Sequence, residues 1–131
     1  MGERYLIDSN VLIDYLNGKL PDLGKVLLRQ IVNDIPLLSV ISKIEVLSYG
    51  DTNDGRKLLL DFIENSNVFE LSNEIVDATI DIRTQKKIKI PDAIIAATAL
   101  VFDFTLLTRN TEDFKSIQGL KMVNPWMLKS L

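Results

Sequence analysis

Acidic side chains recur along this chain at positions where they could share one metal ion. Each follows an apolar stretch that predicts a strand, or opens the helix nearest one: Asp8, Glu45, Asp92 and the pair Asn110 and Asp113. Carboxylates gathered at one place repel each other unless a cation lies among them. Oxygen ligands alone suit Mg²⁺ or Mn²⁺, which retain several waters and bind through a few carboxylates and a substrate phosphate. Such an ion neutralises phosphate and orients a bound water, so the pattern indicates metal-assisted attack of water on a phosphate.

The composition narrows the possible chemistry. Among 131 residues there is no cysteine and no histidine, which excludes disulfides, thiol catalysis, a Ser-His-Asp triad and zinc held by imidazole or thiolate. If the chain is a hydrolase, its carboxylates must do the work. Eighteen acidic residues against 15 basic ones give a net charge of −3. This balance argues against a general nucleic-acid coating protein and leaves a local basic patch open.

Each carboxylate also has a purely structural explanation. Asp8 could cap the helix that follows it. Glu45 lies three residues after Ser42, and Ser-x-x-Glu is a capping box. Asp92 would be favoured by the positive end of a helix dipole, and Asp113 could be an ordinary turn residue. Only their common placement favours a metal site.

Strands and helices alternate along the chain and must bring these acids together. Short apolar stretches predict strands at residues 5–7, 37–40, 68–71, 105–107 and 120–123. Helical spacing of apolar residues predicts helices at 11–16, 22–33, 42–49, 52–64, 75–82 and 92–102. We therefore expect an α/β fold, one domain over residues 1–131, with a central parallel sheet of about four to five short strands and helices on both faces. Ligands of such sheets bind beyond the carboxyl ends of the strands, where Asp8 would lie.

No stretch of the sequence predicts a membrane span or a secretion signal. The longest apolar run, residues 93–102, is much shorter than a bilayer requires and lies between Asp92 and Asp103. The first residues lack the basic and apolar regions of a signal peptide. We expect a cytoplasmic protein with no membrane partner.

Several motifs, taken in order, resemble the PIN domain family and, within it, the VapC-like toxins of bacterial and archaeal toxin–antitoxin pairs. They are LIDSNVLIDYL, SKIEVL, KIPDAIIAATAL with LLTRNTEDF, and VNPW. The resemblance extends from Tyr5 to Trp126, nearly the whole chain. Each motif is short, but their order and spacing make the set fairly specific.

The resemblance implies a Mg²⁺- or Mn²⁺-dependent endoribonuclease that hydrolyses RNA phosphodiester bonds. Such proteins are often homodimers, and a small antitoxin protein silences them by covering the acidic pocket. Carried onto this sequence, Asp8, Glu45 and Asp92 would form the acidic core that holds the metal, directly or through water. Polar neighbours would orient or support this core: Ser9, Asn10 and Thr108.

The sequence departs from the family pattern at Asn110, where many relatives carry a fourth acid. Asn110 cannot supply that charge, although it could act through a bound water. Asp113, one helical turn on, is the alternative fourth acid. A single Mg²⁺ would still have enough ligands because it retains waters, whereas a second ion is left open.

Basic residues near the acids are candidates for RNA contacts. They are Lys86, Lys87, Lys89 and Arg109. The lysines are equally explained as a solvated helix end, favourable at the negative end of its dipole. For Arg109 the alternative is an ion pair with Glu112 or Asp113. For Trp126, packing or a dimer contact is favoured over a platform for base stacking.

Other phosphate-handling classes fit less well. A phosphatase of the haloacid-dehalogenase type needs a second aspartate where this chain has Asn10, and a receiver domain needs an acidic pair that LIDSN lacks. No glycine spacing forms a P-loop or a dinucleotide fingerprint. The serious alternative is a non-catalytic PIN module that binds RNA or protein. A DNA-directed nuclease is a lesser variant, because metal and phosphate contacts do not read the 2′-OH.

Overall fold

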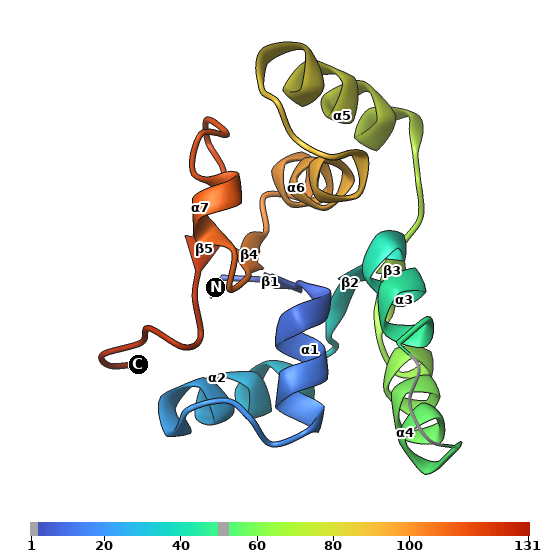
Figure 1. Cartoon of the computed structure of the whole chain (residues 1–131), viewed down its shortest axis with the longest axis vertical. Helices are drawn as coiled ribbons and strands as arrows, with labels where there is room; N and C mark the ends of the chain where they lie inside the picture. The colour runs from blue at the N-terminus through green and yellow to red at the C-terminus, as the bar shows by residue number, and fades with distance from the viewer. Residues whose placement is uncertain (1–2, 50–52) are drawn as a thin grey trace.

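A five-stranded parallel sheet lies at the centre of the computed structural model, which describes residues 3–49 and 53–131 (Figure 1). The strands, in the spatial order β3-β2-β1-β4-β5, are β1 (Tyr5–Ile7), β2 (Leu37–Ser39), β3 (Asn67–Phe69), β4 (Thr105–Leu107) and β5 (Met122–Val123). The helices are α1 (Ser9–Leu16), α2 (Asp22–Asn33), α3 (Val40–Leu47), α4 (Asn53–Glu64), α5 (Asn73–Gln85), α6 (Ile90–Phe102) and α7 (Thr111–Phe114). Because β1 is central, the residue that follows it is flanked by strand ends on both sides.

Helices cover both faces of the sheet, and successive side chains of a strand point to opposite faces. Leu6 and Leu106 lie in an apolar cluster with residues of α5, α6 and α7. Ile7 and Leu107, the next residues along, lie in a second cluster with residues of α1, α2, α3 and α4. Figure 1 shows α5 and α6 on one side of the sheet and α2 on the other. The period-two side-chain alternation of a strand thus fills two cores, and the predicted fold class is confirmed.

The apolar run at 93–102 forms the body of the buried helix α6. Pro91 lies in its first turn, as predicted, where a missing N–H costs nothing. Small alanine side chains make up much of its buried part, which lets the helix approach the sheet and α5 closely. Among the described residues, no helix is long and apolar enough to cross a membrane.

Most predicted element boundaries agree with the structure to within a few residues. The third strand ends at Phe69 rather than at residue 71, and the fifth contains only Met122 and Val123. The predicted break at residues 50–51 and the predicted start of the next helix at residue 52 lie outside the described residues. The described part of that helix begins at Asn53.

The start of α3 differs from the prediction in a way that concerns Glu45. Ser39, not Ser42, is the N-cap of this helix, because its hydroxyl oxygen accepts a hydrogen bond from the Ile41 N–H at 3.1 Å. Ser42 is buried inside the helix, and its hydroxyl has no hydrogen-bond partner within the described part of the chain. The capping-box explanation for Glu45 is therefore wrong.

The segment after β5 packs closely against α2. In this segment the Trp126 N–H donates a hydrogen bond to Asn124 Oδ1 at 2.9 Å. On α2, Gly24 faces Pro125, and a Cβ at Gly24 would lie 2.7 Å from the carbonyl oxygen of Pro125. Figure 1 shows this C-terminal segment descending from β5 toward the level of α2. A glycine is needed here because the two backbones approach so closely.

Gly24→Ala should lower the free energy of unfolding by about 1 kcal/mol, because overpacking costs about 1–3 kcal/mol and the gain in helix propensity is only about 1 kcal/mol. The closest atom belongs to the backbone and cannot rotate away as a side chain would. Urea denaturation measures the change, with Gln30→Ala on the exposed side of the same helix as the control. A Gly24→Ala protein more stable than the wild type would contradict the close approach.

Candidate active site

Asp8 is a buried carboxylate at the carboxyl end of the central strand. It is 5% exposed. It caps α1, since Oδ1 accepts a hydrogen bond from the Ser9 N–H at 2.9 Å. Its second oxygen, Oδ2, accepts a hydrogen bond from the Thr108 hydroxyl at 2.8 Å. Both oxygens are thereby oriented, so capping accounts for only one of the two contacts.

Thr108 joins the end of β4 to Asp8. It is fully buried, and its N–H donates to the carbonyl of Val123 at 3.1 Å. Its hydroxyl oxygen also accepts a hydrogen bond from the Asn110 N–H at 3.0 Å. Asn110 therefore supports the site through its backbone, while its side chain is exposed and does not cap α7.

Glu45 is tied to the start of α1 although it lies on α3. Ser9 donates its hydroxyl to Glu45 Oε1 at 3.0 Å. Since the Ser9 N–H donates to Asp8, this one residue contacts two of the predicted site acids. Glu45 itself is exposed, so its side chain is more accessible to solvent than that of Asp8.

Asp92 and Asp113 approach each other from α6 and α7. Asp92 is partly buried in the first turn of α6. Burial raises its pKa, the charge of Asp113 raises it further, and the nearby Lys89 lowers it. Asp113 is exposed. Asp113, on α7, thus supplies negative charge that acts on Asp92.

The pKa of Asp8 is also raised above its ordinary value. Burial is the main cause, and the charges of Glu45 and Asp92 add to it, while the hydrogen bonds from Thr108 and Ser9 lower the pKa. Asp8 is coupled to Glu45 and Asp92, and Asp92 is coupled to Asp113. The charges of Glu45 and Asp92 therefore act on Asp8, and the charge of Asp113 acts on Asp92.

The donor set suits a hard divalent cation. None of the described residues that shift the pKa of Asp8 is basic, so its charge has no cationic partner among them. Within residues 3–49 and 53–131, no three acidic side chains stand close enough to hold an ion by themselves. Mg²⁺ binds through one or two carboxylates and keeps its waters, so Asp8 and Asp92 with water fit it.

Asn10 does not take the role predicted for it. Its side chain is exposed, and the described residues include no hydrogen bond from it to Asp8. Asn10 is the second residue of α1. The hydrogen bonds to Asp8 come instead from the Ser9 N–H and the Thr108 hydroxyl.

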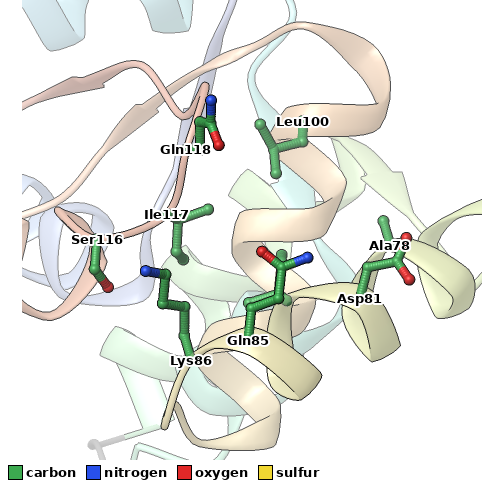
Figure 2. Close-up of a pocket in the computed structure, with 9 residues that line it drawn as sticks. Ala78, Asp81, Gln85, Lys86, Leu100, Ser116, Ile117 and Gln118 are labelled. Carbon is green, nitrogen blue, oxygen red and sulfur yellow. The ribbon is translucent and has the colours of Figure 1, made fainter.

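The three lysines before Asp92 line one hollow of about 800 Å³, which residues 83–89 form and none of the candidate acids lines. Lys89 directly precedes α6 and acts on the pKa of Asp92. Lys86, which follows the last residue of α5, also lines a second hollow of about 440 Å³, again without a candidate acid. Figure 2 shows this hollow between α5, the end of α6 and residues 116–118. Lys87 is exposed on the connection between the two helices.

Arg109 makes a contact that its sequence neighbours did not indicate. Its guanidinium lies over the ring of Trp126, with 4.9 Å from Cζ to the ring centroid. Glu112 pairs instead with Lys115 at 2.6 Å, and the described residues contain no ion pair between Arg109 and Asp113. The contact arises because β4 and β5 pair in parallel, Leu107 beside Val123, so the segments that follow them meet.

Comparison with known proteins places these features in one family. The sequence model of the PIN domain matches residues 5–120. A toxin–antitoxin complex from Klebsiella pneumoniae contains a chain with 29% identity and a TM-score of 0.73, the match covering 95% of this chain and 99% of that one. VapBC2 from Rickettsia felis, bound to a DNA fragment from its promoter, gives 23% identity and a TM-score of 0.76 over 92% and 97% of the two chains. VapBC-1 from nontypeable Haemophilus influenzae gives 23% identity and a TM-score of 0.75, and the match covers 95% of this chain and 98% of that one. No curated protein matches the sequence significantly.

Asp8→Asn should stabilise the metal-free protein at neutral pH. Because the pKa of Asp8 is raised in the folded state, the folded protein binds this proton more tightly than the unfolded chain does. The resulting stability is fully present below the unfolded pKa, about 4, and is lost as the pH rises through the folded pKa. Asparagine stays neutral, so the variant should have no stability advantage near pH 3 and should be more stable than the wild type near pH 7.

Urea denaturation in EDTA at both pH values measures this difference. Asp61→Asn, at an exposed position on α4, is the control and should change the stability by less than about 0.5 kcal/mol. An Asp8→Asn protein that is less stable than the wild type at neutral pH would show that the hydrogen bonds to the carboxylate outweigh the cost of its buried charge.

Proposed function

This chain belongs to the PIN domain family, and we propose that it is a metal-dependent endoribonuclease, the toxin component of a toxin–antitoxin pair. The observation that carries the proposal is the buried carboxylate of Asp8, on which the charges of Glu45 and Asp92 act while none of the described residues that shift its pKa is basic. A nuclease needs a cation at such a place to bring a polyanionic substrate to acidic side chains. The predicted catalytic acids are Asp8, Glu45, Asp92 and Asp113.

Asp8 and Asp92 would hold Mg²⁺ or Mn²⁺, with Glu45 beside them, directly or through water. When bound, the ion would neutralise the substrate phosphate and lower the pKa of a bound water. The chain's own contribution is orientation. Thr108 and Ser9 fix the two oxygens of Asp8, and the Ser9 hydroxyl holds Glu45.

For the fourth acid we propose Asp113. Asn110 contributes its backbone N–H to Thr108, and its side chain carries no charge. Asp113 already raises the pKa of Asp92, which supports a role for it on the same ion or on a water bound to that ion. One ion is the simplest occupancy, because a hydrated Mg²⁺ needs few protein ligands.

The proposed partners are RNA and a small antitoxin protein, with a homodimer as the assembly and the cytoplasm as the location. The toxin–antitoxin complex from Klebsiella pneumoniae supports the antitoxin, since the match covers 95% of this chain at 29% identity. An antitoxin would silence the enzyme by covering the acidic pocket. The choice of RNA rather than DNA rests on the family resemblance of the sequence motifs.

A second candidate is a PIN module that binds RNA or protein without cleaving RNA. Two observations favour it: the neutral Asn110 at the position of a family acid, and the lack, within the described residues, of three acids placed to hold an ion alone. Metal-dependent cleavage separates the two candidates.

The purified protein should cleave a mixed RNA pool with Mg²⁺ or Mn²⁺ and not with EDTA. Asp8→Asn and Asp92→Asn should each abolish cleavage, because each removes a proposed metal ligand. Glu45→Gln should reduce the rate less, since Glu45 is exposed and its oxygen can still accept from Ser9. Asp61→Asn, purified in parallel, controls for contaminating nuclease and should match the wild type. Equal rates in the wild type and Asp8→Asn would refute the proposed mechanism.

Metal binding can be measured without any cleavage. Mg²⁺ at one hundred times its dissociation constant should raise the free energy of unfolding by about 2.7 kcal/mol. Asp92→Asn should reduce this stabilisation, while Asp61→Asn should not. Thermal unfolding across a Mg²⁺ titration gives the result. Stabilisation by Mg²⁺ without any cleavage of RNA would favour the binding module.

A further inference from the structure

We propose that Arg109 and Trp126 form a phosphate-binding platform next to Thr108, the residue that donates to Asp8, in which Trp126 holds the Arg109 guanidinium in place for a backbone phosphate of the RNA. This inference rests on the proposed function and adds to it a binding residue and a positioning residue. It starts from one contact, the guanidinium 4.9 Å above the indole ring.

The stacked geometry leaves the donors of Arg109 available. Stacking on an aromatic ring uses the face of the guanidinium, whereas its five N–H groups lie along the edge in a fork that fits phosphate oxygens. Arg109 is exposed, and no hydrogen bond or ion pair joins its side chain to another residue of the described chain. Glu112, the nearby acid that could have neutralised it, is paired with Lys115.

The backbone of Arg109 lies close to Asp8 because of its neighbours in the chain. Thr108, the residue before it, donates its hydroxyl to Asp8, and Asn110, the residue after it, donates its N–H to Thr108. The backbone of Arg109 is therefore fixed between two residues of the site. An arginine side chain is long enough for its guanidinium to contact one phosphate of a strand while a neighbouring phosphate lies at the acids.

Trp126 is held more firmly than an exposed aromatic residue would be. It is half-buried and packs against the apolar cluster on the α2 side of the sheet. The backbone N–H of Trp126 donates to Asn124 Oδ1, and the preceding residue, Pro125, packs against Gly24 of α2. A fixed ring restricts the flexible arginine before any ligand binds, so less side-chain freedom is lost on binding.

The chain offers a matched control at the opposite end of the sheet. Arg4 is exposed and lies over the ring of Phe104, with 5.0 Å from Cζ to the centroid. Arg4 directly precedes β1, whereas Asp8 directly follows β1. Replacing Arg4 removes the same charge and the same kind of stacking far from the proposed platform.

The test is RNA affinity, measured by fluorescence anisotropy of a labelled single-stranded RNA in EDTA, together with KM and kcat for cleavage in Mg²⁺. Arg109→Gln should weaken binding and raise KM by about 10-fold, as loss of one charged hydrogen-bonded contact predicts. The slope of log affinity against log salt should become shallower by about 0.7, the value for one phosphate contact on a single strand. Arg4→Gln should change neither the affinity nor KM.

Trp126→Leu tests the positioning role. It should weaken binding less than Arg109→Gln, and the double variant should be no weaker than Arg109→Gln alone, because Trp126 acts through Arg109. Additive losses would instead show that the ring contacts RNA directly and would overturn that role. Circular dichroism checks the fold of Trp126→Leu, and if it does not fold, the exposed Arg109→Gln still decides the phosphate contact.

The outcomes separate this inference from the proposed function. A wild type that cleaves RNA while Arg109→Gln keeps its affinity, salt slope and KM would overturn the platform alone. A wild type that neither binds nor cleaves RNA would overturn both.

Discussion

The pairing of β1 with β2 on one side and β4 on the other is the constraint on which the rest of the site depends. The register places Ile7 beside Leu107, so Asp8 and Thr108 follow two adjacent strands at the same level. Only then can the Thr108 hydroxyl reach the Asp8 carboxylate at 2.8 Å. A slip of one residue would turn these side chains to the other face of the sheet and separate them.

That arrangement has an electrostatic cost, which the structure offsets only in part. Burial and the charges of Glu45 and Asp92 raise the pKa of Asp8, while two hydrogen bonds lower it. A chain selected for stability alone would place a neutral side chain here. The cost of this buried carboxylate agrees with the proposal that a cation binds there, since residues that serve a function often lower stability.

Because acidic residues outnumber basic ones, binding of a polyanion would depend on where the basic side chains lie. Among the described residues, Lys89 before α6 is the basic side chain that acts on the pKa of a candidate acid, Asp92. Lys86 and Lys87 line the same hollow as Lys89, and Lys86 also lines the hollow shown in Figure 2. Arg109 follows Thr108 in the chain, and its guanidinium lies over Trp126, next to the close packing of Pro125 on Gly24.

The sequence by itself determined the order of strands and helices, the burial of α6 and the positions of Asp8 and Asp92 at a strand end and a helix start, whereas Glu45 lies inside α3. These features are local, since period-two and helical spacing record which side of each element is buried. The tertiary structure alone decided that Ser39 rather than Ser42 caps α3, that Ser9 joins Asp8 to Glu45, and that Arg109 stacks on Trp126. Each of these outcomes depends on strand register, on the rotation of a helix about its axis, or on the pairing of β4 with β5. Such relations join residues distant in the chain, and neighbouring residues do not encode them.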